Sequence, residues 1–193
     1  MLQEKLSNYN IILASGSPRR QNFFKQLELS FTIQLKEIEE VYPDHLQAAE
    51  ITDYLADLKS KAFTDLKEND LLITSDTIVW FEGRAIGKPK DAEDAFNMLK
   101  EMSGKQHKVY TSVSIKGSYF QKIFHDETIV TFEKFTDEEI QYYIGKDQPF
   151  DKAGSYGIQD WIGLIGVKSI EGSYFNVMGL PVHKLYKELL KIS

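Results

Sequence analysis

The chain has 193 residues and no cysteine, with 42% hydrophobic and 27% charged side chains and a formal net charge of −6. This composition is typical of a globular protein, and the lack of cysteine excludes disulfides and thiolate metal sites, so a metal needs oxygen or imidazole ligands. The acidic charge disfavours sequence-independent binding of nucleic acid. No stretch reaches the roughly 18 apolar residues of a membrane span, and the N-terminus lacks a secretory signal, which predicts a cytoplasmic location.

The N-terminal part of the chain predicts a strand, a tight turn and a helix. Ile11–Ala14 is a short apolar run typical of a buried strand. Ser17 followed by Pro18 is typical of a helix N-cap with proline at the first helical position, and the helix is expected to run to about Leu27. No repeat or linker marks a boundary, so we expect residues 1–193 to form one domain.

The remaining elements alternate between strands and helices. Apolar residues three and four positions apart indicate the helices, and β-branched and aromatic runs indicate the strands. We expect strands over Phe31–Leu35, Leu71–Phe81, Arg84–Ile86, Lys108–Ile115, Lys122–Phe132 and Leu164–Ile170, and helices over Gln47–Leu66, Asp91–Met102, Thr136–Ile144 and from about Pro181. This order predicts an α/β fold with a mixed central sheet and flanking helices.

The turn Ser15-Gly16-Ser17 precedes two adjacent arginines, Arg19 and Arg20. A helix N-terminus after a glycine-containing turn exposes unpaired backbone N–H groups and the positive end of the helix dipole, which suits a phosphate group. Arginine adds forked donors that bind phosphate oxygens in pairs. The alternative is a capped surface helix with solvated arginines, and this short motif does not decide between the two.

Three further charged residues stand in unusual settings. Asp76 lies within an apolar strand, where a carboxylate is costly to bury unless it is paired or binds a metal; otherwise it caps a turn at a strand end. Glu40 follows the strand Phe31–Leu35, and its loop either aims a second carboxylate at the same metal or is simply solvated. Lys88, between a glycine and a proline, either holds an ammonium over phosphates or is an ordinary exposed lysine.

Seven blocks occur in one order along nearly the whole chain: LASGSPRRQ, the IEE loop, the helix ending in KSKA, SDTIV, GKPKDAEDAFNMLKEMSGKQHKVYT, FDKAGSYGIQ and GSYFNVMGLP. Together they resemble the Maf nucleotide pyrophosphatases, also called septum formation proteins. The resemblance implies an α/β fold with two lobes around a substrate cleft and hydrolysis of a nucleoside triphosphate between its α and β phosphates. It also implies a divalent cation, Mg²⁺ or Mn²⁺, and suggests a homodimer.

The resemblance assigns roles to individual residues. Asp76 matches the family's catalytic carboxylate, which with Glu40 is expected to hold the metal. The residues expected to bind phosphates are Ser15, Ser17, Arg19, Arg20, Lys61 and Lys88. Lys59 and Lys61 flank the apolar stripe of their helix on opposite borders, so the periodicity does not choose between them; only the match to KA favours Lys61.

Three positions separate the branches of this family, here Arg19, Thr77 and Gln159. This set resembles the branch that acts on dTTP and UTP, and it leaves modified pyrimidine nucleotides open as substrates. The branch acting on 7-methyl-GTP has glutamate in place of Gln159. A glutamine amide donates to a uracil carbonyl and accepts from N3–H, whereas a carboxylate only accepts. Cytosine stays open, because a flipped amide would match it, and Gln159 read alone is an ordinary polar loop residue.

The expected mechanism is hydrolysis assisted by the metal, with Asp76 orienting or deprotonating the attacking water. Arg19, Arg20 and Lys88 neutralise charge on the triphosphate. Alternatives are the 7-methyl-GTP branch, a nucleotide-binding regulator of cell division without turnover, and a nucleotidyltransferase that requires an acceptor. Release of pyrophosphate from UTP alone separates hydrolysis from a regulator and from a transferase.

Overall fold

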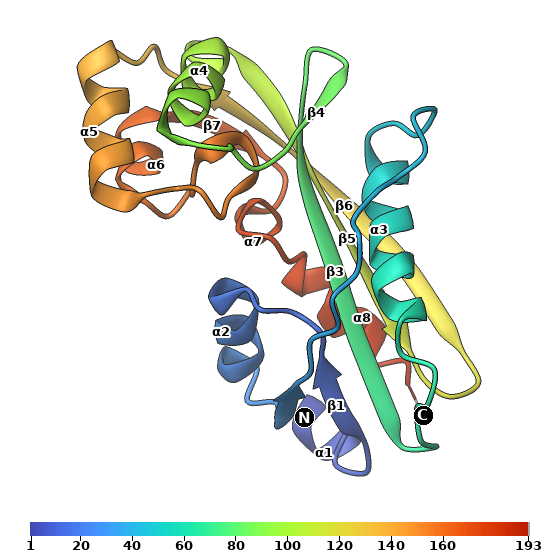
Figure 1. The fold of residues 1–193 in the computed structure, drawn as a ribbon. Coiled ribbons are helices and arrows are strands. Elements are labelled where there is room, and N and C mark those ends of the chain that lie inside the picture. Colours follow the sequence, from blue (N-terminus) through green and yellow to red (C-terminus); the bar gives the residue numbers. More distant parts are fainter. Residues whose placement is uncertain (193) are drawn as a thin grey trace. The chain divides into compact units, whose positions relative to one another are not determined.

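Helices and strands are interspersed along the chain in the computed structural model, which describes residues 1–192 (Figure 1). The strands are β1 (Asn10–Leu13), β2 (Phe31–Ile33), β3 (Asp70–Phe81), β4 (Arg84–Ile86), β5 (Gln106–Lys116), β6 (Gln121–Phe132) and β7 (Val167–Glu171). The helices are α1 (Leu2–Lys5), α2 (Pro18–Gln26), α3 (Ala49–Lys61), α4 (Ala92–Met102), α5 (Asp137–Asp147), α6 (Trp161–Gly166), α7 (Tyr174–Val177) and α8 (Val182–Leu189), with a short 3₁₀ turn, η1, at Ala153–Ser155. Across residues 1–192, no helix combines the length and the apolar character needed to cross a bilayer.

The strands form a mixed sheet in the order β2-β1-β3-β5-β6-β7, and β4 pairs with β3. The strand β1 runs parallel to both β2 and β3. The pairs β3–β4 and β6–β7 are antiparallel. Parallel pairs need long crossover connections, and here α2 and α3 lie in the connections β1–β2 and β2–β3. The predicted α/β fold with a mixed central sheet and flanking helices is confirmed.

The chain divides into two compact units. Unit 1 comprises Met1–Asp76, Thr111–Asp126 and the C-terminal segment from Gly179, and unit 2 comprises Thr77–Tyr110 and Glu127–Met178. The division falls within β3, between Asp76 and the next residue. Among the predicted site residues, Thr77, Lys88 and Gln159 therefore belong to unit 2, and the others belong to unit 1.

In unit 1, α3 is attached to the neighbouring strands by buried hydroxyl groups. The hydroxyl of Thr74 on β3 donates to the carbonyl of Ala56 over 2.6 Å, and those of Thr52 and Ser112 lie 2.6 Å apart. The helix ends at Lys61 and not at Leu66 as predicted. The apolar spacing continues to Leu66 because this residue packs from non-helical chain against a core cluster.

In unit 2, two helices begin within one residue of the predicted start, and each has a local cap. Asp91 accepts a hydrogen bond from the backbone N–H of Asp94 at the start of α4. Thr136 and Glu139 form a reciprocal capping box at the start of α5. Each such cap stabilises a helix by about 1 kcal/mol. Both helices pack on the same hydrophobic core, together with side chains of β3, β5 and β6.

The predicted strand Leu164–Ile170 is wrong in its first half, because residues up to Gly166 belong to α6 and β7 begins at Val167. Two glycines explain the difference. A Cβ on Gly163 would lie 2.0 Å from the carbonyl oxygen of Ile158, and one on Gly166 would lie 1.9 Å from the ring of Phe135. These close approaches allow a short helical turn that the apolar composition alone does not reveal.

Candidate functional site

The turn between β1 and α2 is organised by Ser15. Its side-chain oxygen accepts a hydrogen bond from the backbone N–H of Ser17 over 3.3 Å and one from Nη1 of Arg20 over 3.4 Å. Ser17 occupies the N-cap position of α2, but its side chain makes no capping hydrogen bond, contrary to the predicted cap. The buried hydroxyl of Ser15 thus holds the turn, and Pro18 stands at the first helical position as predicted.

Arg20 connects three segments of unit 1. Its Nε donates to the carbonyl of Gly179 over 2.8 Å, and its Nη1 donates to the carbonyl of Ser75 over 2.9 Å. Burial lowers the pKa of Arg20, and the negative charge of Asp76 opposes that shift; the guanidinium stays protonated. Because these N–H groups are already engaged, the geometry favours a positioning role for Arg20 over a purely phosphate-binding one.

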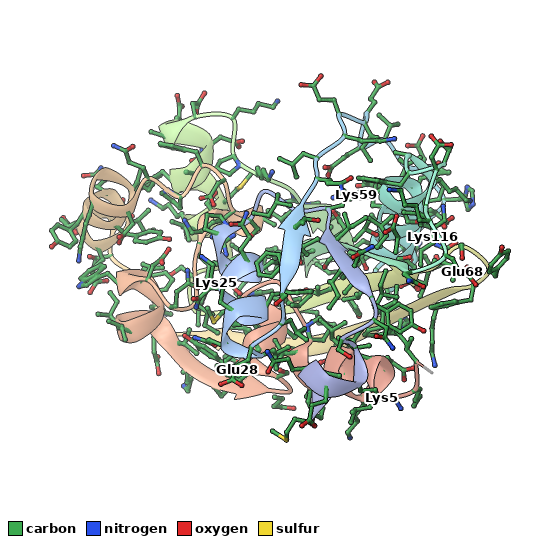
Figure 2. The ribbon with its side chains drawn as sticks, turned by 90° about the horizontal axis from the view of Figure 1, so that it is seen from below. Lys5, Lys25, Glu28, Lys59, Glu68 and Lys116 are labelled. Atoms are coloured by element: carbon green, nitrogen blue, oxygen red, sulfur yellow. The ribbon has the colours of Figure 1, made fainter. Side chains whose placement is uncertain are left out.

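A buried carboxylate at the junction within β3 is paired with a lysine of α3. Asp76 is 7% exposed, and Nζ of Lys59 lies 2.6 Å from its Oδ1. The same ammonium lies 3.2 Å from Oε1 of Glu40, which belongs to the segment between β2 and α3. Lys59 is labelled in Figure 2. A buried carboxylate without a partner costs several kcal/mol. Lys59 supplies that partner, and the three residues form one charged cluster.

Lys61, which the sequence motif favours, lies elsewhere. Its side chain is 67% exposed, and its ammonium contacts Asp57 of the same helix at 2.6 Å. That hydrogen bond raises the pKa of Lys61. Residues two positions apart differ by about 200° around a helix, so Lys59 and Lys61 necessarily point in opposite directions. The structure places Lys59, and not Lys61, beside Asp76.

Sequence reasoning misses Lys59 because it leaves Thr52, Ala56 and Ser60 out of the apolar stripe of α3. It draws that stripe through Ile51, Tyr54, Leu55, Leu58, Ala62 and Leu66. The buried residues of α3 are Ile51, Thr52, Leu55, Ala56 and Ser60. At about 100° per residue, the centre of this buried face lies about 90° around the helix from the centre of the predicted stripe. Lys59 then lies at the middle of that face, while Tyr54 of the predicted stripe is exposed. Small residues on a helix are the signal that points to it.

Two predicted residues of unit 2, Thr77 and Lys88, differ in their surroundings. Thr77 follows Asp76 on β3, so the two side chains point to opposite faces of the strand. Lys88 is exposed in the loop after β4, and within residues 1–192 it makes no ion pair or hydrogen bond through its side chain. The loop itself is held in place, because the carbonyl of Gly87 accepts a hydrogen bond from the N–H of Gly154 over 2.9 Å. Lys88 therefore presents a solvated ammonium on an anchored loop.

Gln159 lies in the loop before α6, and its amide contacts the next residue. Nε2 of Gln159 donates to Oδ1 of Asp160 over 2.9 Å. The other oxygen of Asp160 accepts from the hydroxyl of Tyr143 over 3.1 Å. Sequence reasoning singles out Gln159 but not Asp160. That Asp160 links Gln159 to Tyr143 is seen only from these contacts.

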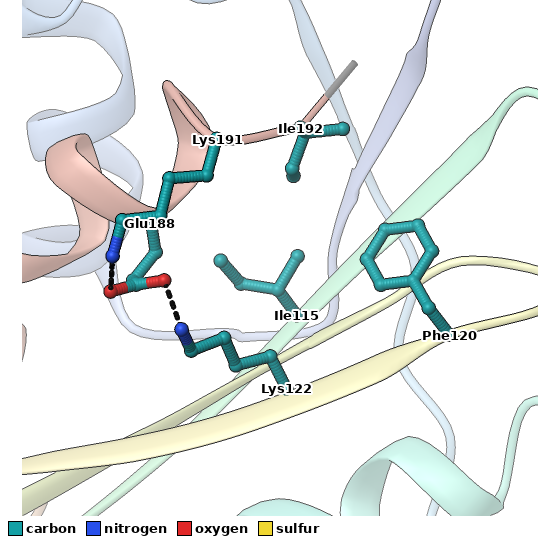
Figure 3. A pocket seen from close by; sticks show the side chains of 6 residues that line it. All are labelled: Ile115, Phe120, Lys122, Glu188, Lys191 and Ile192. Carbon is teal, nitrogen blue, oxygen red and sulfur yellow. Dashed lines mark hydrogen bonds and ion pairs between the residues drawn. The ribbon is translucent and has the colours of Figure 1, made fainter.

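A cavity of about 260 Å³ in unit 1 contains none of the predicted site residues (Figure 3). Its lining consists of Ile115, Phe120, Lys122, Glu188, Lys191 and Ile192. The two lysines both contact Glu188, Lys122 at 2.5 Å and Lys191 at 2.7 Å. These contacts lower the pKa of Glu188. With its charges already paired, this cavity offers no evident site for a phosphate.

The donor set of the charged cluster fits a hard cation. Asp76 and Glu40 both contact the ammonium of Lys59, so a single cation in that position would lie within reach of oxygens from both side chains. Mg²⁺ is commonly held by one or two carboxylates, with water and substrate phosphates completing its shell. Within residues 1–192, no group of three or more His, Cys, Asp or Glu side chains is arranged to hold a metal by itself. Two carboxylates are therefore enough for a metal ion whose remaining ligands are water and the phosphates of a bound substrate.

The fold of the chain is similar to that of solved structures of Ham1 proteins. One from Staphylococcus aureus matches with a TM-score of 0.50 and 16% identity, covering 94% of this chain and 98% of that chain. One from Coxiella burnetii matches with a TM-score of 0.52 and 14% identity, covering 95% and 100%. At this level of identity the likeness shows the fold alone, an α/β fold like that of the Ham1 proteins.

Comparison of the sequence with known proteins identifies the family of the chain. A family model described as "Maf-like protein" matches residues 10–192. Proteins named dTTP/UTP pyrophosphatase are 58% identical over 190 residues in Flavobacterium johnsoniae and 59% identical over 191 residues in Flavobacterium psychrophilum, with 98% of each chain covered in both cases. One from Bacteroides thetaiotaomicron is 47% identical over 189 residues, covering 97% of this chain and 98% of that protein. The chain belongs to the Maf-like protein family, which confirms the resemblance seen in its motifs.

Proposed function

We propose that this protein is a nucleoside triphosphate pyrophosphatase that hydrolyses dTTP and UTP to the monophosphate and pyrophosphate. The names of its relatives support the substrates. The observation that carries the chemistry is the pairing of buried Asp76 with Lys59 and Glu40. A protein that only bound nucleotides would have no need of this buried carboxylate.

The phosphates are proposed to bind near the β1–α2 turn. The first backbone N–H groups of α2 have no partners within the helix, and its dipole favours an anion there. Ser15 and Ser17 contribute the turn, and Arg19 contributes a guanidinium. Arg20 holds the turn against Ser75 and Gly179, so its part is to keep these groups in place as charge develops on the phosphates.

We propose a divalent cation as the cofactor: Asp76 and Glu40 would hold it, and it would supply a Lewis acid at the α-phosphate. Asp76 orients the attacking water and accepts its proton. Lys59 contributes a positive charge beside the same carboxylates and replaces Lys61 in our assignment. Mg²⁺ and Mn²⁺ both suit oxygen ligands of this kind.

In unit 2, Gln159 and Thr77 are proposed to recognise the base, and Lys88 to bind phosphate oxygens. Gln159 lies on a loop fixed by Asp160 and Tyr143, which suits a specificity residue. The exposed ammonium of Lys88 is available to a ligand without first breaking an ion pair.

We further propose that residues 1–193 form one Maf-like domain, in line with the family match over residues 10–192. A cytoplasmic location follows from the proposed substrate, because free nucleoside triphosphates are cytoplasmic metabolites. That location and the homodimer stay predictions.

The test is release of pyrophosphate from UTP or dTTP without any acceptor. We expect turnover by the wild-type protein and at least a ~10²-fold loss in Asp76→Asn, the lower range for losing a positioned acid or base. Asp70→Asn is the matched control, because Asp70 lies on the same strand but bonds to Asn10 and the N–H of Lys67. Absence of pyrophosphate from wild type, or equal turnover in Asp76→Asn, would contradict the proposal.

A further inference from the structure

The amide of Gln159 is held in one orientation. Its Nε2 donates to Oδ1 of Asp160 over 2.9 Å. Its Oε1 is shielded from solvent and has no hydrogen-bond partner among the residues that the structure describes. A buried acceptor without a partner is unusual in a folded protein and calls for an explanation.

The orientation follows from the chemistry of the neighbour. An ionised carboxylate accepts hydrogen bonds and donates none, so a flipped amide would set Oε1 of Gln159 against Oδ1 of Asp160. The nitrogen must therefore face Asp160, and the oxygen must face away. A neutral amide at position 160 would impose no such choice, because it offers both an oxygen and an NH₂ group.

The carboxylate of Asp160 is itself held in place by a hydrogen bond to its other oxygen. The hydroxyl of Tyr143 donates to Oδ2 of Asp160 over 3.1 Å and accepts from the N–H of Gly157 over 3.0 Å. Burial raises the pKa of Tyr143, which keeps its hydroxyl protonated as a donor. Gly157 is needed for this arrangement, because a Cβ there would lie 2.2 Å from Oδ2 of Asp160.

We propose that Asp160 is a positioning residue that makes Gln159 selective for uracil and thymine over cytosine. Uracil and thymine carry a donor at N3 and a carbonyl at C4, whereas cytosine carries an acceptor at N3 and an amino group at C4. One amide orientation matches the first pattern, and the flipped orientation matches the second. The locked amide offers Oε1 to N3–H and its second N–H to a carbonyl, so the group left without a partner is the one that the preferred base satisfies.

This inference rests on the proposed function, in which Gln159 contacts the base. It also requires a movement, because Oε1 is shielded in the structure and the side chains that cover it must shift before a base pairs with it. Once paired, a flip of the amide would cost contacts with both the base and Asp160.

The test is the ratio of kcat/KM for UTP to kcat/KM for CTP in Asp160→Asn. We expect the ratio to fall at least about tenfold, because both orientations of Gln159 then find a partner at position 160. A ratio measured on one preparation does not depend on the fraction of folded protein. Asp151→Asn is the matched control: it removes a carboxylate that contacts the same lysine, Lys152, as Asp160 does, and should leave the ratio unchanged.

A second pair of variants keeps the outcome clear. Tyr143→Phe removes the hydroxyl behind Asp160 and should lower the ratio in the same direction if Asp160→Asn does not fold. Gln159→Glu tests the base contact alone. An unchanged ratio in Asp160→Asn or Tyr143→Phe, with a changed ratio in Gln159→Glu, would overturn the role of Asp160. An unchanged ratio in all three, with UTP still hydrolysed, would remove Gln159 from base recognition and leave the pyrophosphatase activity standing.

Discussion

Replacing Lys59 by methionine tests the charged cluster directly. The change removes the ammonium 2.6 Å from Asp76 and keeps a side chain of similar length. Breaking a buried ion pair by removing one partner costs about 3–5 kcal/mol, because the other charge stays buried. We expect about 3 kcal/mol, the low end, because the positive charge of Arg20 still interacts with Asp76.

Lys61→Met is the matched control, two residues along the same helix. Lys61 is 67% exposed and pairs with Asp57 at i,i+4, and such surface pairs contribute about 0.3–0.5 kcal/mol. Urea unfolding measures both, and with a slope of about 2 kcal/mol per molar the midpoint falls by about 1.5 M in one variant and about 0.2 M in the other. Similar small shifts in the two variants would show that Lys59 does not compensate for the burial of Asp76.

A double variant tests whether Lys59 and Asp76 contribute to stability as a pair. In Lys59→Met combined with Asp76→Asn, neither charge remains, so the loss of stability should be smaller than the sum of the two single losses by at least about 1 kcal/mol. Additive losses would mean that the two residues act independently despite their contact. The same Lys59→Met protein should also turn over UTP at least ~10²-fold more slowly than wild type, if its charge takes part in the reaction.

Two further predictions concern the metal and pH. Chelation by EDTA should abolish pyrophosphate release, and Mg²⁺ or Mn²⁺ should restore it; full activity in the chelator would remove the metal from the mechanism. Burial lowers the pKa of His107, which lies 2.7 Å from the hydroxyl of Tyr156, from 6.5 to about 4. Between pH 6.5 and pH 4 the unfolded chain binds more protons than the folded protein, so stability is lost as the pH falls through this range. The free energy of unfolding at pH 5 should be about 2 kcal/mol below that at pH 8. This difference in the free energy of unfolding between pH 8 and pH 5 should vanish in His107→Gln and persist in His45→Gln, which alters an exposed histidine. Equal pH dependence in the two variants would refute the role of His107.

Features that depend on near neighbours can be predicted from the sequence. The starts of α4 and α5 follow from Asp91 and from the capping box of Thr136, both of which bond three residues ahead. The long strand β3 follows from its β-branched and aromatic run. The need of Asp76 for a partner or a metal also follows from the sequence, because a carboxylate inside an apolar strand is costly wherever the strand lies. The order of the motifs along the chain is by itself enough to indicate the family.

The partners of the charged groups are decided by the tertiary structure. Lys59 reaches Asp76 across 17 positions in the chain, and Arg20 reaches the carbonyls of Ser75 and Gly179 across 55 and 159 positions. The spacing of residues within a helix does not predict such pairs, because the same sequence pattern occurs whether solvent or a strand lies next to that side of the helix. Even the contact of Gln159 with adjacent Asp160 acquires its meaning from Tyr143, 17 residues from Asp160. Which cation a buried carboxylate meets, and which way an amide faces, depend on where remote segments are brought by the packing of the sheet and its helices.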